Sequence, residues 1–469
     1  MSVHPLLSQA LVAAQAKFGE SNVYVADEHK KNVFGVTCPM AFGWLVGGSD
    51  KVPLRRIIGC DGPSGSFKSA LMMEHARWFL CDGGLVILID TEEKVSDTLV
   101  CGMLFKEDLN ARMNYVYAKA TSVEQAQELI THFKSHAAKQ VTSGAKPEDM
   151  VPWLLIWDSL TGRDTKEAQD KIAKEGHAQV RAYADAASSI ARFYKGFSFG
   201  DELVTLAHVQ HVGKNMDDKA VGDEEWKPKG GDEPKYSSTY HFRITRTKAI
   251  SSAKWEGKEL TIKCIKSGLG PDKRKLDVRI LWEFVWVDQP VFEGTGDDRS
   301  IVVNEAEAPT TRERAQEYYN WTQQSLSGRD ALILKEFLGL DDPKKEKFQW
   351  PLTERIRFQR TWWDWDWALG NLLVNGMKYN EKTPAATKAD LDEALHFVKG
   401  PNTKTVKCEA LFGSEDSVVS LEEFGRKIQE TPDVCKRISS FLGISHYAGF
   451  RDVVLGGARA GSKRGKKGG

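Results

Sequence analysis

The stretch GPSGSFKS, at residues 62–69, decides the fold expected for the whole chain. A short apolar segment, residues 54–59 (LRRIIG), precedes it, and residues 70–80 behind it are good helix formers with apolar side chains at helical spacing. In such a strand–turn–helix unit, backbone N–H groups point at a bound phosphate, where the helix dipole favours negative charge. We therefore predict a phosphate-binding loop made of Gly62, Pro63, Ser64, Gly65, Ser66, Phe67, Lys68 and Ser69.

Two residues that end this loop have definite chemical roles in the prediction. Lys68 would reach the β- and γ-phosphate oxygens of ATP, and the Ser69 hydroxyl would bind Mg²⁺. Phe67 departs from the common pattern G-x-x-x-x-G-K-[ST], in which a glycine precedes the lysine. A chance Gly/Ser turn before a helix is the alternative interpretation, and the flanking strand and helix argue against it.

Two other apolar segments end in acidic residues, as the second half of a nucleotide site requires. Residues 151–157 (VPWLLIW) lead into Asp158, and residues 85–89 lead into the acidic run Asp90-Thr91-Glu92-Glu93. Ligands of open parallel sheets bind outside the carboxyl ends of the strands, so Asp158 would join Ser69 at the Mg²⁺ ion. One of the two glutamates would polarise the attacking water, although an ordinary solvated strand end explains that acidic run equally well.

These segments resemble the RecA family of recombinases, and most closely its phage UvsX type, whose loop commonly reads GPS-x-SFKS. The resemblance extends from about residue 50 to about residue 285. It implies that Glu92 rather than Glu93 activates the water. It also implies that His208, which ends the apolar residues 203–208 (LVTLAH), senses the γ-phosphate and couples the nucleotide state to DNA.

The resemblance further implies two loops that bind single-stranded DNA. Residues 212–235 combine charged residues, Gly and Pro without apolar periodicity, which predicts a long loop that returns to the core near Gly230-Gly231. A surface insertion is the alternative, and acids in the same stretch dilute its positive charge. A first loop would lie within residues 162–177, where a solvated helix face explains the charges equally well. The candidate contacts to DNA phosphates are Arg163, Lys166, Lys214, Lys227, Lys229, Gly230, Gly231 and Lys235.

A strand that carries lysines is another feature of the resemblance. Residues 261–268 (TIKCIKSG) are similar to the family strand whose lysines cross a subunit interface to the neighbour's ATP, which gives Lys263 and Lys266 a role in catalysis. Gly268 stands where the family pattern has a second cation. The alternative interpretation is that these lysines lie on the solvent-exposed face of an edge strand.

Composition is compatible with an intracellular ATPase. The formal net charge of +0 means that any contact with nucleic acid must come from local basic surface. Cysteines scattered without C-x-x-C spacing argue for a reducing compartment and against a zinc site. Apolar runs are strand-sized and the N-terminus lacks a basic, cleavable leader, so we expect a cytoplasmic protein of a bacterial or phage-infected cell, with no membrane contact.

The expected fold class is α/β: a RecA-like ATPase core, residues 50–293, with a mostly parallel twisted sheet flanked by helices and an antiparallel extension. Strand candidates alternate with helical stretches and later follow one another closely, which favours this order. Residues 1–49 would form a helical segment, and the resemblance implies that it packs on a neighbouring protomer; a helix that caps its own domain is the alternative.

Beyond the core we expect a linker at residues 294–311, a mainly helical, tryptophan-rich domain at 312–457, and a disordered basic tail at 458–469. The cluster TWWDWDW, residues 361–367, is interpreted as core packing because acids interleave its rings. A base-stacking platform is the alternative.

Taken together, the resemblance implies a DNA-dependent ATPase that forms a homo-oligomeric helical filament on single-stranded DNA. It would pair that strand with homologous double-stranded DNA and exchange strands in recombination, repair and recombination-dependent replication. A mediator or single-strand-binding protein would be a further partner. Two alternatives stay open. One is a RecA-fold motor or switch, such as a ring helicase or a protein-remodelling ATPase. The other is a non-catalytic nucleotide-binding filament adaptor, which stays open because Gly268 stands where a second interface cation is expected.

Overall fold

The computed structural model describes most of the chain between residues 35 and 444. The described residues are 12–14, 16, 35–95, 100, 102–103, 113–144, 150–166, 169–170, 180–200, 202–214, 226–268, 273–307, 310–375, 397–399, 405–408, 418–442 and 444. The predicted basic tail and most of the predicted N-terminal helix lie outside these residues.

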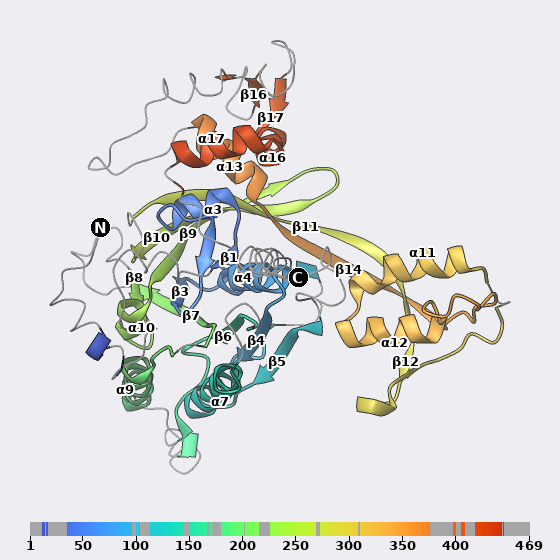
Figure 1. Cartoon of the computed structure of the whole chain (residues 1–469), viewed down its shortest axis with the longest axis horizontal. Helices are drawn as coiled ribbons and strands as arrows, with labels where there is room; N and C mark the ends of the chain where they lie inside the picture. The colour runs from blue at the N-terminus through green and yellow to red at the C-terminus, as the bar shows by residue number, and fades with distance from the viewer. Residues whose placement is uncertain are drawn as a thin grey trace, which may run out of the picture.

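A large, mostly parallel central sheet organises this mixed α/β fold (Figure 1). Its parallel part consists of β3 (Ile57–Gly62), β7 (Val204–Lys214), β6 (Trp153–Asp158), β4 (Leu85–Asp90) and β5 (Tyr115–Lys119), in that spatial order. All five end at the same edge of the sheet because each is parallel to its neighbour. The loop after β3 therefore lies beside the residues that follow β4 and β6.

An antiparallel extension continues the sheet on the other side of β3. There β9 (Tyr240–Ser251) pairs parallel with β3, and β10 (Glu256–Ser267), β11 (Lys275–Pro290) and β14 (Thr353–Asp364) follow, each antiparallel to the strand before it. The expected antiparallel extension is thus present.

Helices cover both faces of the parallel strands, and the alternation of side chains along each strand explains how. In β4 and β6, Val86, Leu88 and Ile156 pack in one core with α3 (Met40–Leu45) and α4 (Lys68–Cys81). Their neighbours in sequence, such as Ile87, pack on the opposite face with α7 (Val123–Thr142) and α9 (Val180–Gly196). Strands that are buried on both faces read as continuous apolar runs, which is how the sequence identified them.

The prediction of a separate, mainly helical domain after the linker is wrong for residues 353–364. These residues form β14, which pairs along its whole length with β11, so the central sheet takes strands from both sides of the predicted linker. Alternating residues such as Ile356 and Phe358 give this segment the period of a strand. Within the linker itself, β13 (Ser300–Ile301) pairs with β12 (Phe292–Glu293).

The tryptophan cluster is core, as the sequence predicts. Trp363 on β14, and Trp365 and Trp367 on α13 (Trp365–Asn375), are all buried. The indole N–H of Trp363 donates to the Ala70 carbonyl at 3.2 Å, and that of Trp365 donates to the Glu74 carboxylate at 2.8 Å. The cluster therefore fixes β14 and α13 against α4, the helix that follows the 62–69 loop.

Two smaller helical groups complete the described part of the chain. One, α11 (Arg312–Thr322) and α12 (Gly328–Leu338), has its own apolar cluster and lies at the end of a long ribbon formed by β11 and β14 (Figure 1). The other, α16 (Leu421–Glu430) and α17 (Pro432–Phe441), packs on α13. The remaining short elements are β1 (Gly35–Thr37), β2 (Lys51–Pro53), β8 (Trp226–Pro228), α10 (Glu233–Ser237), β15 (Phe397–Lys399), β16 (Thr405–Cys408), β17 (Val418–Ser420) and the 3-10 turns η4 (Gly296–Asp298) and η5 (Gln323–Ser325).

None of the helices in the described ranges has the length and apolar character needed to cross a bilayer.

The junction of β14 and α13 contains a buried acid that makes stability depend on pH. Asp364 accepts a hydrogen bond from the Trp367 N–H at 2.9 Å, and burial raises its pKa to about 7. The unfolded chain therefore loses this proton at a lower pH than the folded chain does, so folding stability falls as pH rises between about 4 and 7.

The Asp364→Asn side chain can still accept the hydrogen bond from the Trp367 backbone N–H, but it never ionises. We predict that the stability of this variant relative to the wild type increases as pH rises through this range, and reaches about 2–4 kcal/mol at pH 8. Thermal unfolding at a series of pH values measures it. A difference in Tm that stays constant from pH 4.5 to pH 8 would contradict the assignment.

Candidate functional site

The 62–69 loop has a left-handed backbone at two positions. Gly65 has φ 74°, and Phe67, at the start of α4, has φ 64°. The common loop pattern has glycine at the position of Phe67, because a side chain on a left-handed residue destabilises the fold by about 1–2 kcal/mol. In this chain the Phe67 ring stacks on Trp282 of β11, with ring centroids 6.1 Å apart and planes 20° apart, and this contact offsets the strain.

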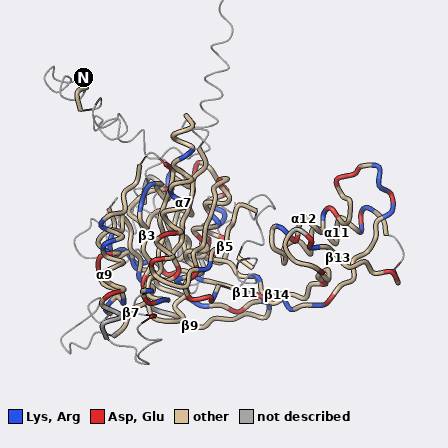
Figure 2. Tube along the Cα trace, turned by 90° about the horizontal axis from the view of Figure 1, so that it is seen from below, with Lys and Arg blue, Asp and Glu red and all other residues tan. Residues whose placement is uncertain are grey.

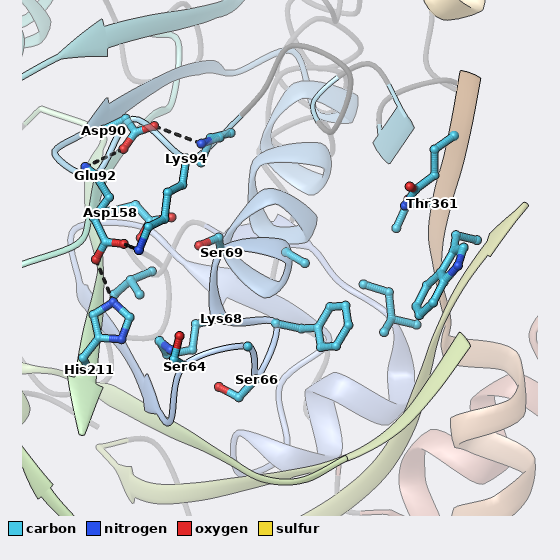
Figure 3. A pocket seen from close by; sticks show the side chains of 18 residues that line it. Ser64, Ser66, Lys68, Ser69, Asp90, Glu92, Lys94, Asp158, His211 and Thr361 are labelled. Carbon is cyan, nitrogen blue, oxygen red and sulfur yellow. Dashed lines mark hydrogen bonds and ion pairs between the residues drawn. The ribbon is translucent and has the colours of Figure 1, made fainter. Parts of the chain in front are cut away.

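Polar groups of the loop face a cavity of about 330 Å³ (Figure 3). The Lys68 ammonium is buried and donates to the Pro63 carbonyl at 2.8 Å, and burial lowers its pKa. The Ser66 hydroxyl is buried and has no hydrogen-bond partner among the described residues. Around Gly65 there is open space on the side where a Cβ would stand. These features fit a phosphate chain bound along the loop.

Asp158 lies next to the start of α4, as the sequence predicts. Its carboxylate is hydrogen-bonded with Ser69, and burial is the main cause that raises its pKa to about 6. The groups of the chain itself therefore compensate its charge only in part, and a divalent cation between Asp158 and Ser69 fits this donor set. No cluster of three or more His, Cys, Asp or Glu side chains suits a metal in the described ranges, so phosphate and water oxygens would supply the other ligands.

Asp90 organises the turn that follows β4. Its carboxylate accepts hydrogen bonds from the backbone N–H groups of Glu92, Glu93 and Val95 at 2.8, 2.8 and 3.1 Å, and from the Tyr117 hydroxyl at 3.1 Å. With four donors, this carboxylate is committed to holding the turn. The conformation of this turn determines where the side chains of Glu92 and Glu93 point.

Glu92 and Glu93 point to different surroundings. Glu92 lines the cavity, where its carboxylate contacts the His211 ring at 2.7 Å and the Lys94 ammonium (Figure 3). It also accepts a hydrogen bond from the Ser159 hydroxyl. These contacts, the hydrogen bond with His211 first, lower the pKa of Glu92 well below its usual range. Glu93 instead pairs with Lys119 and Arg163 outside the cavity.

The structure places His208 away from the cavity, so the role predicted for it has to be corrected. Alternate residues of β7 face opposite sides of the sheet, and Val209 and His211 are the two that line the cavity. His208 faces α9, where its ring packs against Tyr194 and is fully buried with both ring nitrogens lacking hydrogen-bond partners in the described part of the chain. Burial lowers its pKa well below the usual value. His211, three residues further on, occupies the position expected for His208.

One wall of the cavity comes from the antiparallel extension and was missed by the sequence analysis. Ile280 and Trp282 of β11 and Gln359 and Thr361 of β14 line it. No local pattern identifies these residues, because their position depends on the pairing of two strands that are far apart in the sequence.

The second predicted DNA loop returns to the core at the end of β7, beside the cavity. The Lys229 N–H donates to the His211 carbonyl at 2.7 Å, and the Gln210 amide donates to the carbonyls of Lys229 and Gly231, each at 2.8 Å. A Cβ on Gly230, which has φ 87°, would stand 2.8 Å from the Thr161 methyl group. The end of β7 therefore contacts both the Glu92 carboxylate and the glycine pair of the second loop.

The basic residues of these loops have varied surroundings. Arg163 is bound to Glu93, and the Lys166 N–H donates to Glu124. Lys227 is exposed on β8, which pairs with the end of β7. The side chain of Lys214 and residues 171–179 and 215–225 lie outside the described residues.

Lys263 and Lys266, on β10, do not line the cavity of their own chain. The Lys266 ammonium donates to the carbonyls of Lys235 and Tyr236, and burial lowers its pKa. Gly268 is exposed, and its N–H donates to the Thr239 carbonyl at 2.7 Å. Within one chain, then, Lys266 holds the end of α10.

No known protein family matches this chain, and no curated protein sequence is significantly similar to it.

We predict that Asp90→Ala disorders the turn at residues 91–95, because three backbone N–H groups lose their acceptor, at a cost of about 1–3 kcal/mol for each one left buried. Hydrogen exchange should show loss of protection at the amides of Glu92, Glu93 and Val95. Tyr117→Phe, which removes only the fourth donor, is the matched control and should keep their protection. Unchanged exchange in Asp90→Ala would show that the turn is held by other contacts.

Proposed function

We propose that this chain is an ATP-dependent DNA recombinase of the RecA type, most similar to the phage UvsX proteins. The observation that carries the proposal is the convergence of the 62–69 loop, Asp158 and Glu92 on one cavity, with the end of β7 linking Glu92 to the glycine pair at 230–231. A nucleotide site joined by a few hydrogen bonds to a loop that carries Lys227, Lys229 and Lys235 suits an enzyme whose ATP turnover responds to DNA.

Each residue of the cavity has a distinct task in this proposal. ATP is the substrate, with its phosphates along the loop and on Lys68, and Mg²⁺ at Ser69 and Asp158 would neutralise the charge that develops on them. Glu92 stays ionised at neutral pH because its pKa is depressed, so it acts by orienting and polarising a water molecule. His211 positions that carboxylate and is hydrogen-bonded through its carbonyl to Lys229.

Strand pairing would follow from a filament of many copies on single-stranded DNA, in the cytoplasm of a bacterial or phage-infected cell. The loop residues hold the phosphates, and base pairing with a homologous duplex supplies sequence specificity. In such a filament Lys263 and Lys266 act on the ATP of the neighbouring subunit. Mediator or single-strand-binding proteins are then the expected partners.

Steady-state ATP hydrolysis with and without oligothymidylate, titrated with salt, tests the proposal. We expect several-fold stimulation by DNA that declines as salt rises, because the loops neutralise phosphates. Lys68→Ala should abolish turnover, and Lys254→Ala, an exposed lysine in the turn between β9 and β10, should leave it unchanged. Turnover indifferent to DNA would favour a protein-remodelling ATPase or another motor, and no turnover in either condition would favour a nucleotide-binding adaptor.

The two adjacent glutamates allow a matched comparison. We predict that Glu92→Gln lowers kcat by about 10²-fold or more while ATP binding is retained, because the amide cannot polarise water as a carboxylate does. Glu93→Gln should reduce kcat by less than about threefold, since Glu93 makes exposed ion pairs outside the cavity. Equal kcat values for the two variants would show that Glu92 is not the residue that polarises the attacking water.

A further inference from the structure

The ribbon of β11 and β14 continues beyond the cavity as two strands that reach α11 and α12 (Figures 1 and 2). Residues 283–290 pair with residues 353–360 over this length. One face of the ribbon is covered: Val287 and Phe358 are buried there, with Val285 and Ile356 packed against them. The opposite face carries the alternate residues.

That opposite face bears exposed aromatic rings. Phe284 is 44% exposed and Trp286 is 56% exposed, although side chains of this size are usually covered. The same face includes Trp282 and Gln359, which line the nucleotide cavity, since residues two apart in a strand point the same way. The exposed rings therefore extend one wall of the cavity outward along the ribbon.

Two arginines of β14 lie over these rings from the neighbouring strand. The Arg357 guanidinium is 3.9 Å from the centroid of Phe284, and that of Arg355 is 5.2 Å from the centroid of Trp286. Neither arginine forms an ion pair with an acid in the described part of the chain. We refer to Phe284, Trp286, Arg355 and Arg357 as the aromatic–arginine ladder.

Arg360 of β14, which lies over a ring of α11, is an arginine with a structural role and serves as a comparison. Arg360 lies 4.5 Å from the ring centroid of Trp321, but it is also bound to Glu283 at 3.3 Å and to Gln324 at 3.0 Å. Its charge is thus compensated within the protein. By contrast, neither ladder arginine has a hydrogen-bond or ion-pair partner in the described part of the chain, so their donors are available to a bound ligand.

We propose that the aromatic–arginine ladder is a second binding surface for single-stranded nucleic acid, separate from the loops beside the cavity. Unpaired bases stack on exposed rings and on guanidinium planes whatever their sequence, and the arginines also supply charge to the phosphates. Asp288 lies opposite Arg355 in the ribbon register, so Arg357 is the main phosphate contact. Lysines, arginines and acids are interspersed along the ribbon in Figure 2, which favours a strand held by stacking over one held by net charge.

This inference adds to the proposed function but is tested apart from it. Fluorescence anisotropy of the full chain is measured with a labelled oligothymidylate, with an abasic oligomer of the same length, and with a duplex. Trp286→Ala should weaken oligothymidylate binding about tenfold, because a stacking contact is lost, and should leave binding of the abasic oligomer unchanged. Arg357→Gln should weaken the binding of both oligomers and reduce the dependence of their affinity on salt.

Trp321→Ala is the matched control. Trp321 is also an exposed tryptophan beneath an arginine, but the charge of that arginine, Arg360, is compensated by Glu283. The variant should bind all three ligands as the wild type does. Equal losses of Trp286→Ala on oligothymidylate, abasic oligomer and duplex would overturn the ladder as a stacking surface. Unchanged DNA binding together with altered self-association would overturn it in favour of a protein contact. ATP hydrolysis that is stimulated by DNA in the same preparation shows that such a failure concerns the ladder and leaves the proposed function in place.

Discussion

The register of four parallel strands is the constraint on which the rest of the site depends. Because β3, β7, β6 and β4 run in the same direction, Asp90 lies opposite Asp158, and Gly62, the first residue of the loop, lies opposite His211. Side chains alternate between the two faces, so a slip of one residue in β7 would exchange His211 for Gln210 in the cavity. Val204 and Leu206 pack on the face covered by α7 and α9, and Ala207 and Val209 pack in the core that contains α4, so the packing of β7 fixes which face each of its residues takes.

Three carboxylates at this edge do different work because their surroundings differ. Asp90 is occupied by four donors of its own turn. Asp158 is buried with too few compensating groups, which raises its pKa and makes it suited to a cation. Glu92, which lines the same cavity, is held ionised by His211 and neighbouring donors. The division of roles thus follows from hydrogen bonding and burial, and it does not require that the three side chains differ chemically.

Much of this arrangement could be predicted from local sequence. The loop at 62–69, the helix after it, and the acids that end β4 and β6 all follow from apolar runs interrupted by turn chemistry. The choice between His208 and His211 could not, because both stand near the end of one strand and only its register against β3 decides which faces the cavity. The position of β14 was equally hidden, since its period-two pattern gives no sign of the distant strand with which it pairs.

Phe67 shows how the two halves of the chain depend on each other. Its left-handed backbone would favour glycine, and the ring of Trp282 stabilises it from a strand more than two hundred residues away in sequence. Trp282 is held in turn by the pairing of β11 with β14, and β14 is fixed to α4 through Trp363. The loop, its helix and the ribbon therefore form one continuous set of contacts. A ligand that stacks along the ribbon would contact β11, the strand whose Trp282 supports the loop.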